Sequence, residues 1–166
     1  MASDITCSND AAQNGDEAPP RVGGFWPDAN LWPDTDPSLT VVSDLPNAGD
    51  LSRGQATDML RGRVGGAAVA HLGNAAYDVG RWFGEHGTEG FRIAVGVSGS
   101  RVLIEFTDHG EQCPDPYRSR TDADLAHNIL CSYVVAWGWK ISDGIRALRI
   151  FADADSPTLP TGEYFQ

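Results

Sequence analysis

The apolar periodicity of the chain changes from helical to strand-like after Phe83, and this change constrains the fold more than any other feature. Between Val69 and Phe83, apolar residues recur at steps of three and four, which places them on one face of a helix. Two strand-like runs follow at residues 91–97 and 101–106, and only a short turn containing Ser-Gly-Ser separates them. Such a pair predicts an antiparallel hairpin. The apolar face of the helix then needs a sheet to pack on.

Further elements are expected on both sides of this unit. A short strand is predicted at Leu39–Val42, and the chain from Leu51 to Gly87 is predicted to be helical. A second helix is predicted to begin at the Thr-Asp-Ala-Asp pattern of residues 121–124 and to end at Trp137-Gly138. A last strand is expected at Ala147–Ala152. This order predicts an α+β fold, a two-layer sandwich with a small mixed, mostly antiparallel sheet and the helices on one face.

The acidic charge lies at the two ends of the chain. Residues 1–50 hold nine Asp and Glu against one Arg, residues 51–151 hold eleven acids and eleven bases, and residues 152–166 hold three acids and no base. The neutral middle has the size of one ordinary domain. It offers no basic surface, which argues against nucleic acid and anionic membranes as partners. No apolar run is long enough to span a bilayer, and no secretion signal is expected.

This distribution suggests four segments. Residues 1–24 are expected to form a disordered acidic tail, because they carry too little apolar surface to offset the entropy of ordering. Residues 25–50 are rich in Trp and Pro and are expected to be extended or turn-rich. Residues 51–152 are expected to form the domain, and residues 153–166 an acidic C-terminal tail.

The Trp- and Pro-rich segment contains Trp-Pro-Asp twice, beginning at Trp26 and at Trp32. Proline disfavours both a regular helix and a central strand at these positions. Two interpretations stay open: the two indoles pack on the chain's own domain, or they bind a partner. The first is favoured, because large aromatic side chains are seldom left exposed without use.

The cysteines and histidines predict neither a disulfide framework nor a metal site. Cys7, Cys113 and Cys131 are an odd number and show no Cys-x-x-Cys spacing. A reduced, cytoplasmic compartment fits this pattern best. Cys113 is expected to be an inert thiol, because no base stands at a fixed spacing from it. None of the four histidines forms an i, i+4 pair of the kind that zinc hydrolases use.

The stretch from Arg101 to Ala152, together with the helix before it, resembles the histidine-kinase-like ATPase domain, or Bergerat fold. The likeness is greatest to the bacterial anti-sigma-factor serine kinases and covers about residues 64–152. It rests on four features in chain order, which are the Asp-x-Gly triplet at Asp108 to Gly110, the prolines Pro114 and Pro116, the pair Trp137-Gly138, and the strand at Leu148–Phe151.

The resemblance implies a nucleotide site. In the family, the Asp of the triplet accepts a hydrogen bond from the adenine amino group, and the Gly lets the base approach the backbone. Asp108 and Gly110 match this pair. A family helix carries Glu-x-x-x-Asn, in which the Glu acts as general base and the Asn binds Mg²⁺. ATP and Mg²⁺ are therefore the cofactors that an active member of this family would use.

Two alignments of that helix stay open. In the first, Asn74 takes the place of the metal ligand, but Ala70 stands where the general base belongs. In the second, Asp78 takes the place of the base and His86 that of a trailing histidine, but Trp82 replaces the metal ligand. The second is favoured, because Asn74 lies nearly opposite the apolar stripe on a helical wheel. Either alignment lacks one catalytic group, and Asp78 is the catalytic candidate if the domain is active.

The segment that should hold the phosphates departs further from the family. No glycine stands between Pro116 and Leu125, and Asp122 and Asp124 would repel a triphosphate. We therefore expect a regulatory protein-binding module that resembles an anti-sigma factor, lacks kinase activity, and contacts a sigma factor or an anti-sigma antagonist in the cytoplasm. Two alternatives stay open, an active ATP-dependent serine kinase and an acidic inhibitor that mimics DNA. Homodimer formation is also left open.

Overall fold

The computed structural model describes residues 21–24, 38–87, 89–115, 119–129 and 133–156, with residues 21–24 described by their backbone alone. The elements in chain order are β1 (Arg21–Gly24), β2 (Ser38–Val42), the short 3₁₀ helix η3 (Leu45–Asn47), α1 (Ala48–Leu60), α2 (Gly66–His86), β3 (Phe91–Ser98), β4 (Arg101–Asp108), α3 (Arg120–Ile129), β5 (Val134–Ser142) and β6 (Ile145–Asp153).

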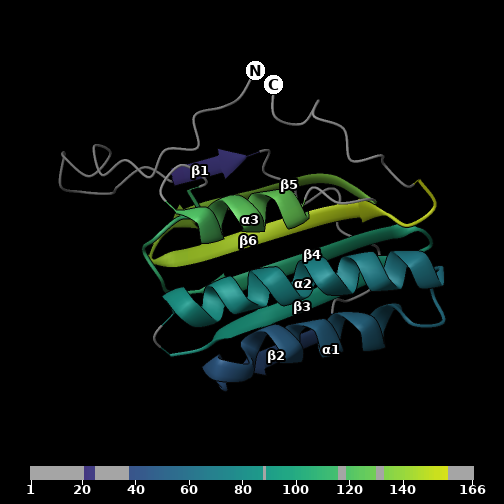
Figure 1. Cartoon of the computed structure of the whole chain (residues 1–166), viewed down its shortest axis with the longest axis horizontal. Helices are drawn as coiled ribbons and strands as arrows, with labels where there is room; N and C mark the ends of the chain where they lie inside the picture. The colour runs from purple at the N-terminus through teal and green to yellow at the C-terminus, as the bar shows by residue number, and fades with distance from the viewer. Residues whose placement is uncertain (1–20, 25–37, 88, 116–118, 130–132, 157–166) are drawn as a thin grey trace.

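The strands form one sheet in the order β1-β5-β6-β4-β3-β2, and every neighbouring pair is antiparallel. The three α-helices lie together on one face of this sheet (Figure 1). The expected α+β sandwich with helices on one face is thus confirmed. The expected mixed character of the sheet is not seen, because all the described pairs run antiparallel.

The predicted hairpin is β3 and β4. Its register pairs Arg92 with Thr107 at one end and Ser98 with Arg101 at the other. Gly99 sits in the turn with a φ of 59°, a backbone conformation that glycine adopts without steric cost. The hairpin lies at the centre of the core because one face of each strand is apolar.

The prediction of a long second helix is wrong. Helix α3 ends at Ile129, and Trp137-Gly138 lies in strand β5, which pairs with β6 through a turn at Asp143 and Gly144. The helical spacing of apolar residues ends at Ile129, and beyond it β-branched and aromatic residues dominate. Such residues pack well on a sheet, so pairing with β6 prevails over helical propensity.

The helical stretch expected from Leu51 to Gly87 is two helices, α1 and α2, that break at residues 61–65. They pack very closely. A Cβ at Gly80 would lie within 2.6 Å of the Ser52 Cβ, and one at Gly84 within 2.9 Å of the Ala48 Cβ. The glycines of this stretch therefore serve close helix contact, which explains their unusual frequency in a helix.

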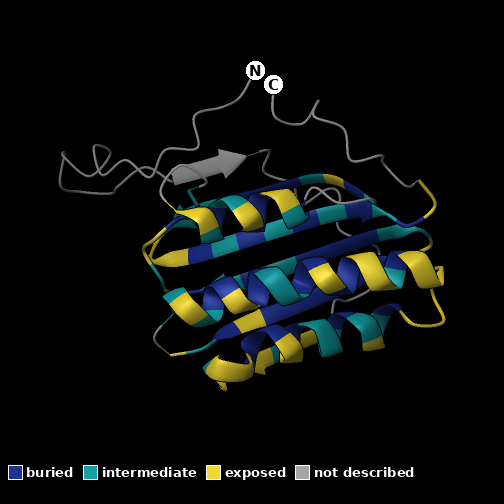
Figure 2. Cartoon of the chain, viewed as in Figure 1, coloured by how far each residue is buried: buried dark blue, intermediate teal, exposed yellow. Residues whose placement is uncertain are grey.

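The core lies between the helices and the sheet (Figure 2). The predicted stripe on α2 faces it, with Leu72, Ala76, Val79 and Phe83 buried and Val69 partly buried. Three phenylalanine rings from α2, β3 and β4 meet at its centre, with centroids 5.6 to 6.0 Å apart. Burial of this single cluster is the main stabilising contribution to the fold.

The structured part of the chain begins before residue 51. β1 lies within the segment expected to be a tail, and β2, η3 and the start of α1 lie within the segment expected to be extended. The predicted strand at Leu39–Val42 is confirmed as β2. Residues 1–20, 25–37 and 157–166 lie outside the described residues, so the disorder of both tails stays a prediction. Among the described helices, none is long and apolar enough to cross a membrane.

Candidate functional site

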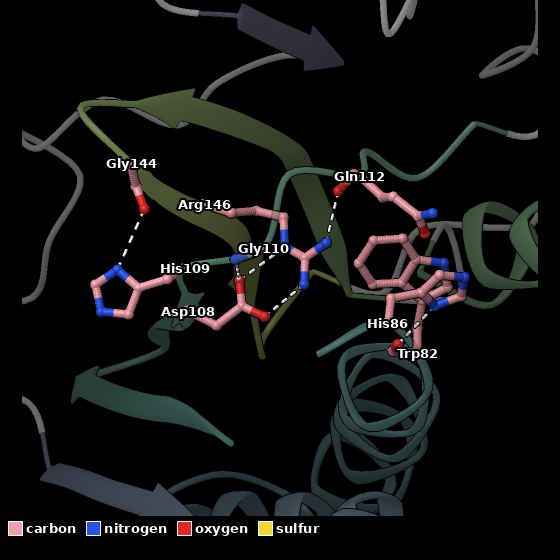
Figure 3. A network of polar contacts seen from close by, with 8 residues as sticks. All are labelled: Trp82, His86, Asp108, His109, Gly110, Gln112, Gly144 and Arg146. Atoms are coloured by element: carbon pink, nitrogen blue, oxygen red, sulfur yellow. Dashed lines mark hydrogen bonds and ion pairs between the residues drawn. The ribbon is translucent and has the colours of Figure 1, made fainter. Parts of the chain in front are cut away.

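The polar side chains that the resemblance singles out lie at one end of the sheet, beside α2 (Figure 3). Asp108 is the last residue of β4, and Arg146 stands opposite it in β6. The Arg146 Nε donates to the Asp108 Oδ1 over 2.8 Å, and the second guanidinium nitrogen contacts the other carboxylate oxygen. Both side chains are almost fully buried. They form a bidentate ion pair, a geometry that gives strong charge-assisted hydrogen bonds.

Arg146 is held on every side. Its third nitrogen donates to the carbonyl oxygen of Gln112 over 2.6 Å, and the guanidinium carbon lies 4.8 Å from the ring centroids of both Trp82 and Phe83. Such cation–π contacts add attraction where the cation is desolvated. The residue has no exposed surface. Arg146 was not singled out from the sequence, although its alternation with the buried residues of β6 was a usable signal.

Gly110 is required by this pair. Its N–H donates to the Asp108 Oδ1 over 3.0 Å, which closes a tight turn after β4. A Cβ at this position would clash with the guanidinium of Arg146. The Asp-x-Gly triplet here thus lets an arginine of the same chain approach the backbone, at the place where the resemblance would put adenine.

Trp82 occupies the position of the metal ligand in the favoured alignment, and it is buried. Its Nε1–H donates to the Asp122 Oδ1 over 2.6 Å, while the other oxygen of Asp122 accepts from the N–H of Asp115 over 2.9 Å. The ring of His86 stacks on the indole at 4.3 Å, and its Nδ1 donates to the carbonyl oxygen of Trp82. Trp82 therefore ties α2 to α3 and fills the space between them.

Asp78 lines a small depression between α2 and α3, which Trp82 also lines. The lining residues are Asp78, Arg81, Trp82, Thr121, Asp124, Leu125 and Asn128. Burial raises the pKa of the Asp78 carboxyl above its ordinary value, and the charge of Asp124 acts in the same direction. Arg81, Arg53 and a hydrogen bond with Asn128 oppose that rise.

The structure brings four of the six candidate residues into one network, namely Trp82, His86, Asp108 and Gly110. Asp78 lies one turn of α2 away, and Asn74 is exposed, as expected from the helical wheel. Trp26 and Trp32 lie outside the described residues. The side chains present do not fit MgATP as the resemblance would position it, because Arg146 occupies the adenine place and Trp82 replaces the metal ligand.

The expectation of a free thiol at Cys113 is wrong. Cys113 is fully buried and disulfide-bonded. The other two cysteines of the chain, Cys7 and Cys131, lie outside the described residues. An odd number of cysteines did not exclude one bridge, because spacing along the sequence says nothing about which sulfur atoms meet in the fold.

Within the described part of the chain, no three His, Cys, Asp or Glu side chains gather in a way that could hold a metal ion. The chain matches no protein-family model, no curated protein and no solved structure.

Proposed function

We propose that this chain is a regulatory protein-binding module, of the kind that its resemblance to anti-sigma factors suggests, and that it works by contact without transferring phosphate. The observation that carries this proposal is the bidentate pair between Arg146 and Asp108. Both carboxylate oxygens of Asp108 already accept hydrogen bonds from Arg146, and one of them also accepts from Gly110. The acceptor that adenine would need is engaged.

The energy of this pair supports the proposal that no nucleotide competes for Asp108. An adenine base could reach Asp108 only by separating two buried charges, and breaking a buried ion pair costs about 3–5 kcal/mol. That cost lowers affinity by about two to nearly four powers of ten. A site that would otherwise bind ATP at about micromolar concentration would then bind it at about 0.1 mM to several millimolar.

The contact surface that we propose is the edge of the sheet at β2. β2 is the last strand of the sheet on one side, and its Leu39 and Val41 are 60% and 62% exposed. An edge strand offers unpaired backbone groups to an extended segment of another chain, and apolar side chains beside it give such pairing more area. A transcription-regulatory protein that presents an extended strand is the partner that we propose for this edge.

Calorimetry with MgATP tests the absence of nucleotide binding. We expect the wild-type chain to give no micromolar binding. Micromolar binding that disappears in Asp108→Asn, with folding verified by circular dichroism, would overturn the proposal. Arg146→Met is an informative companion, because it removes the guanidinium from the adenine place while leaving Asp108 available.

Affinity capture from the native host tests the contact surface. The wild-type chain is expected to capture a transcription regulator. The double variant Leu39→Asp/Val41→Asp is expected not to capture it. Leu51→Asp is the matched control, because Leu51 is also a large exposed apolar residue, but it lies on α1. Equal capture by wild type and the β2 variant would rule out this edge as the contact.

An active serine kinase is the second candidate, and the environment of Asp78 favours it. A carboxyl with a raised pKa beside a surface depression suits a general base. Under this alternative, MgATP binds and a partner protein is phosphorylated, and Asp78→Asn abolishes transfer without abolishing binding. Both candidate functions place the protein in the cytoplasm. The Cys113 disulfide would tend to be reduced there.

A further inference from the structure

We infer that the face of the sheet opposite the helices is a docking site for the chain's own Trp-Pro-Asp segment, residues 25–37. This inference goes beyond the proposed function and does not depend on it. It rests on three observations about the described residues: the complete burial of Leu103, the places where the chain leaves β1 and enters β2, and the charge of the sheet face.

Leu103 is buried on the side of the sheet that no α-helix covers. The neighbouring positions Val102 and Ile104 belong to the core cluster beneath the helices, so the alternation of a strand turns Leu103 to the opposite face. Its exposed fraction is nevertheless 0%, and it is not part of that cluster. A leucine in the middle of an uncovered sheet face would remain partly exposed to solvent.

The row of residues across the sheet at Leu103 is apolar. Pairing places Gly96 on one side of Leu103 and Phe151 on the other, and Ala136 follows Phe151. Four adjacent strands therefore contribute no charged side chain along this line. The missing side chain of Gly96 leaves room beside Leu103 for a bulky group, and an indole ring is a group of this kind.

The described ends of the connection between β1 and β2 point toward this row. β1 and β2 are the two edges of the sheet (Figure 1). Pairing also puts their facing ends, Gly24 and Leu39, on one line, which passes through Gly138, Arg149, Glu105 and Ala94. β1 runs toward the apolar row of Leu103 as it ends at Gly24. β2 runs away from that row as it begins at Ser38.

The length of the connection favours the face without helices. Five strand spacings separate β1 from β2, which is about 24 Å. The connection from Gly24 to Ser38 can reach about 46 Å when extended. A path over the helix layer would add a climb of about 15 Å at each edge and would total about 54 Å. The connection is too short for that path and long enough for the open face.

The charges of the two surfaces are complementary. The outward-facing charged positions of the sheet, as given by strand alternation, are Arg92, Arg101, Lys140 and Arg149 against Glu105 and Asp153, and Arg149 pairs with Glu105. The net charge of this face is therefore positive, whereas residues 25–37 carry three aspartates and no base. The segment thus brings two indoles for the apolar row and carboxylates to a face with an excess of basic side chains.

Acrylamide quenching of tryptophan fluorescence in the full chain tests this inference. The other three tryptophans, Trp82, Trp137 and Trp139, are at most 7% exposed, so accessible fluorescence reports Trp26 and Trp32. If the segment is docked, quenching of the wild type stays as weak as that of Trp26→Phe/Trp32→Phe. If two of the five indoles are quenched as readily as free indole, the inference is wrong.

Variants of the sheet face complete the test. Leu103→Asp is expected to raise quenching severalfold. Arg101→Glu changes an outward-facing residue two positions from Leu103 and spares the core, and it is expected to raise quenching in the same direction. Arg63→Glu is the matched control, because Arg63 is exposed in the connection between α1 and α2. No rise in Arg101→Glu or in folded Leu103→Asp would overturn the inference. Protection that is lost on dilution, with a dimer mass by light scattering, would instead identify a second copy as the occupant and overturn it equally.

Discussion

Asp108 and Arg146 are opposite each other in neighbouring strands and are also joined through their side chains. They are 38 positions apart in sequence. In β4, Asp108 follows Val102, Ile104 and Phe106 on the core face, and in β6, Arg146 precedes Leu148 and Ile150 on the same face. Each charged residue thus continues a row of apolar residues on the core face. Pairing of the two strands brings the two charges together, and their ion pair offsets the energetic cost of burying them.

Removal of one member of this pair is expected to be severe. Arg146→Met leaves the Asp108 carboxylate buried without its partner, and we expect the free energy of unfolding to fall by about 3–5 kcal/mol in urea titrations. Arg81→Met is the control, because the Arg81–Glu85 pair is half exposed and 3.7 Å long, and its loss should cost less than about 1 kcal/mol. The double variant Asp108→Leu/Arg146→Met is expected to recover most of the loss. Equal effects of the two single changes would contradict this account.

Two glycine-to-alanine changes are expected to have opposite effects. Gly80→Ala puts a methyl group against Ser52 and the carbonyl of Ala48, so α1 and α2 must separate and the melting temperature should fall. Gly54→Ala meets no atom within 4 Å and should stabilise α1 by about 0.5–1 kcal/mol through helix propensity. Thermal unfolding of both variants under one condition measures the contrast. A stabilised Gly80→Ala would show that the helices are not in close contact at this point.

The raised pKa of Asp78 predicts a pH dependence of stability. Because burial raises the pKa in the folded state, the folded chain binds a proton before the unfolded chain does, and stability increases as pH falls through that pKa toward about 4. Asp78→Asn should therefore be more stable than wild type at pH 7, and the difference should shrink toward pH 4. Chemical unfolding at several pH values measures it.

Asp153 is the control for this prediction, because its pKa is shifted in the opposite direction. The N–H of Asp155 and the hydroxyl of Ser100 lower the pKa of its carboxyl, so its contribution is present at neutral pH and is lost as pH falls below about 4. In Asp153→Asn, this loss of stability at low pH should be absent. A pH profile of Asp78→Asn that is parallel to the wild-type profile would contradict the assignment of a buried, perturbed carboxyl at Asp78.

The disulfide at Cys113 predicts a dependence of stability on reductant. Opening one bridge in a domain of this size is expected to lower the free energy of unfolding by about 2–5 kcal/mol. Urea unfolding of the wild type with and without dithiothreitol measures the effect, and Cys113→Ser should unfold at the midpoint of the reduced wild type under both conditions. Identical midpoints for oxidised and reduced wild type would be incompatible with a stabilising bridge.

Local patterns predicted much of this fold. The three- and four-residue spacing on α2 identified the buried face that includes Leu72 and Phe83, and alternation with a glycine turn identified the hairpin of β3 and β4. The end of the second helix was mispredicted because Trp137 suits either a helix or a strand until pairing with β6 decides between them. The structure places the candidate residues Asp108, Gly110, Trp82 and His86 in one network, but their assignment to a nucleotide site stays a prediction, and the resemblance that selected them said nothing of Arg146.

The sequence by itself determined the secondary structure where periodicity and turn chemistry act within a few residues. Only the tertiary structure decided what stands beside Asp108, that Cys113 is bridged, and that β1 and β2 close opposite edges of one sheet. The physical reason is distance along the chain. Contacts between residues tens of positions apart depend on strand pairing and close packing, which local propensity does not encode.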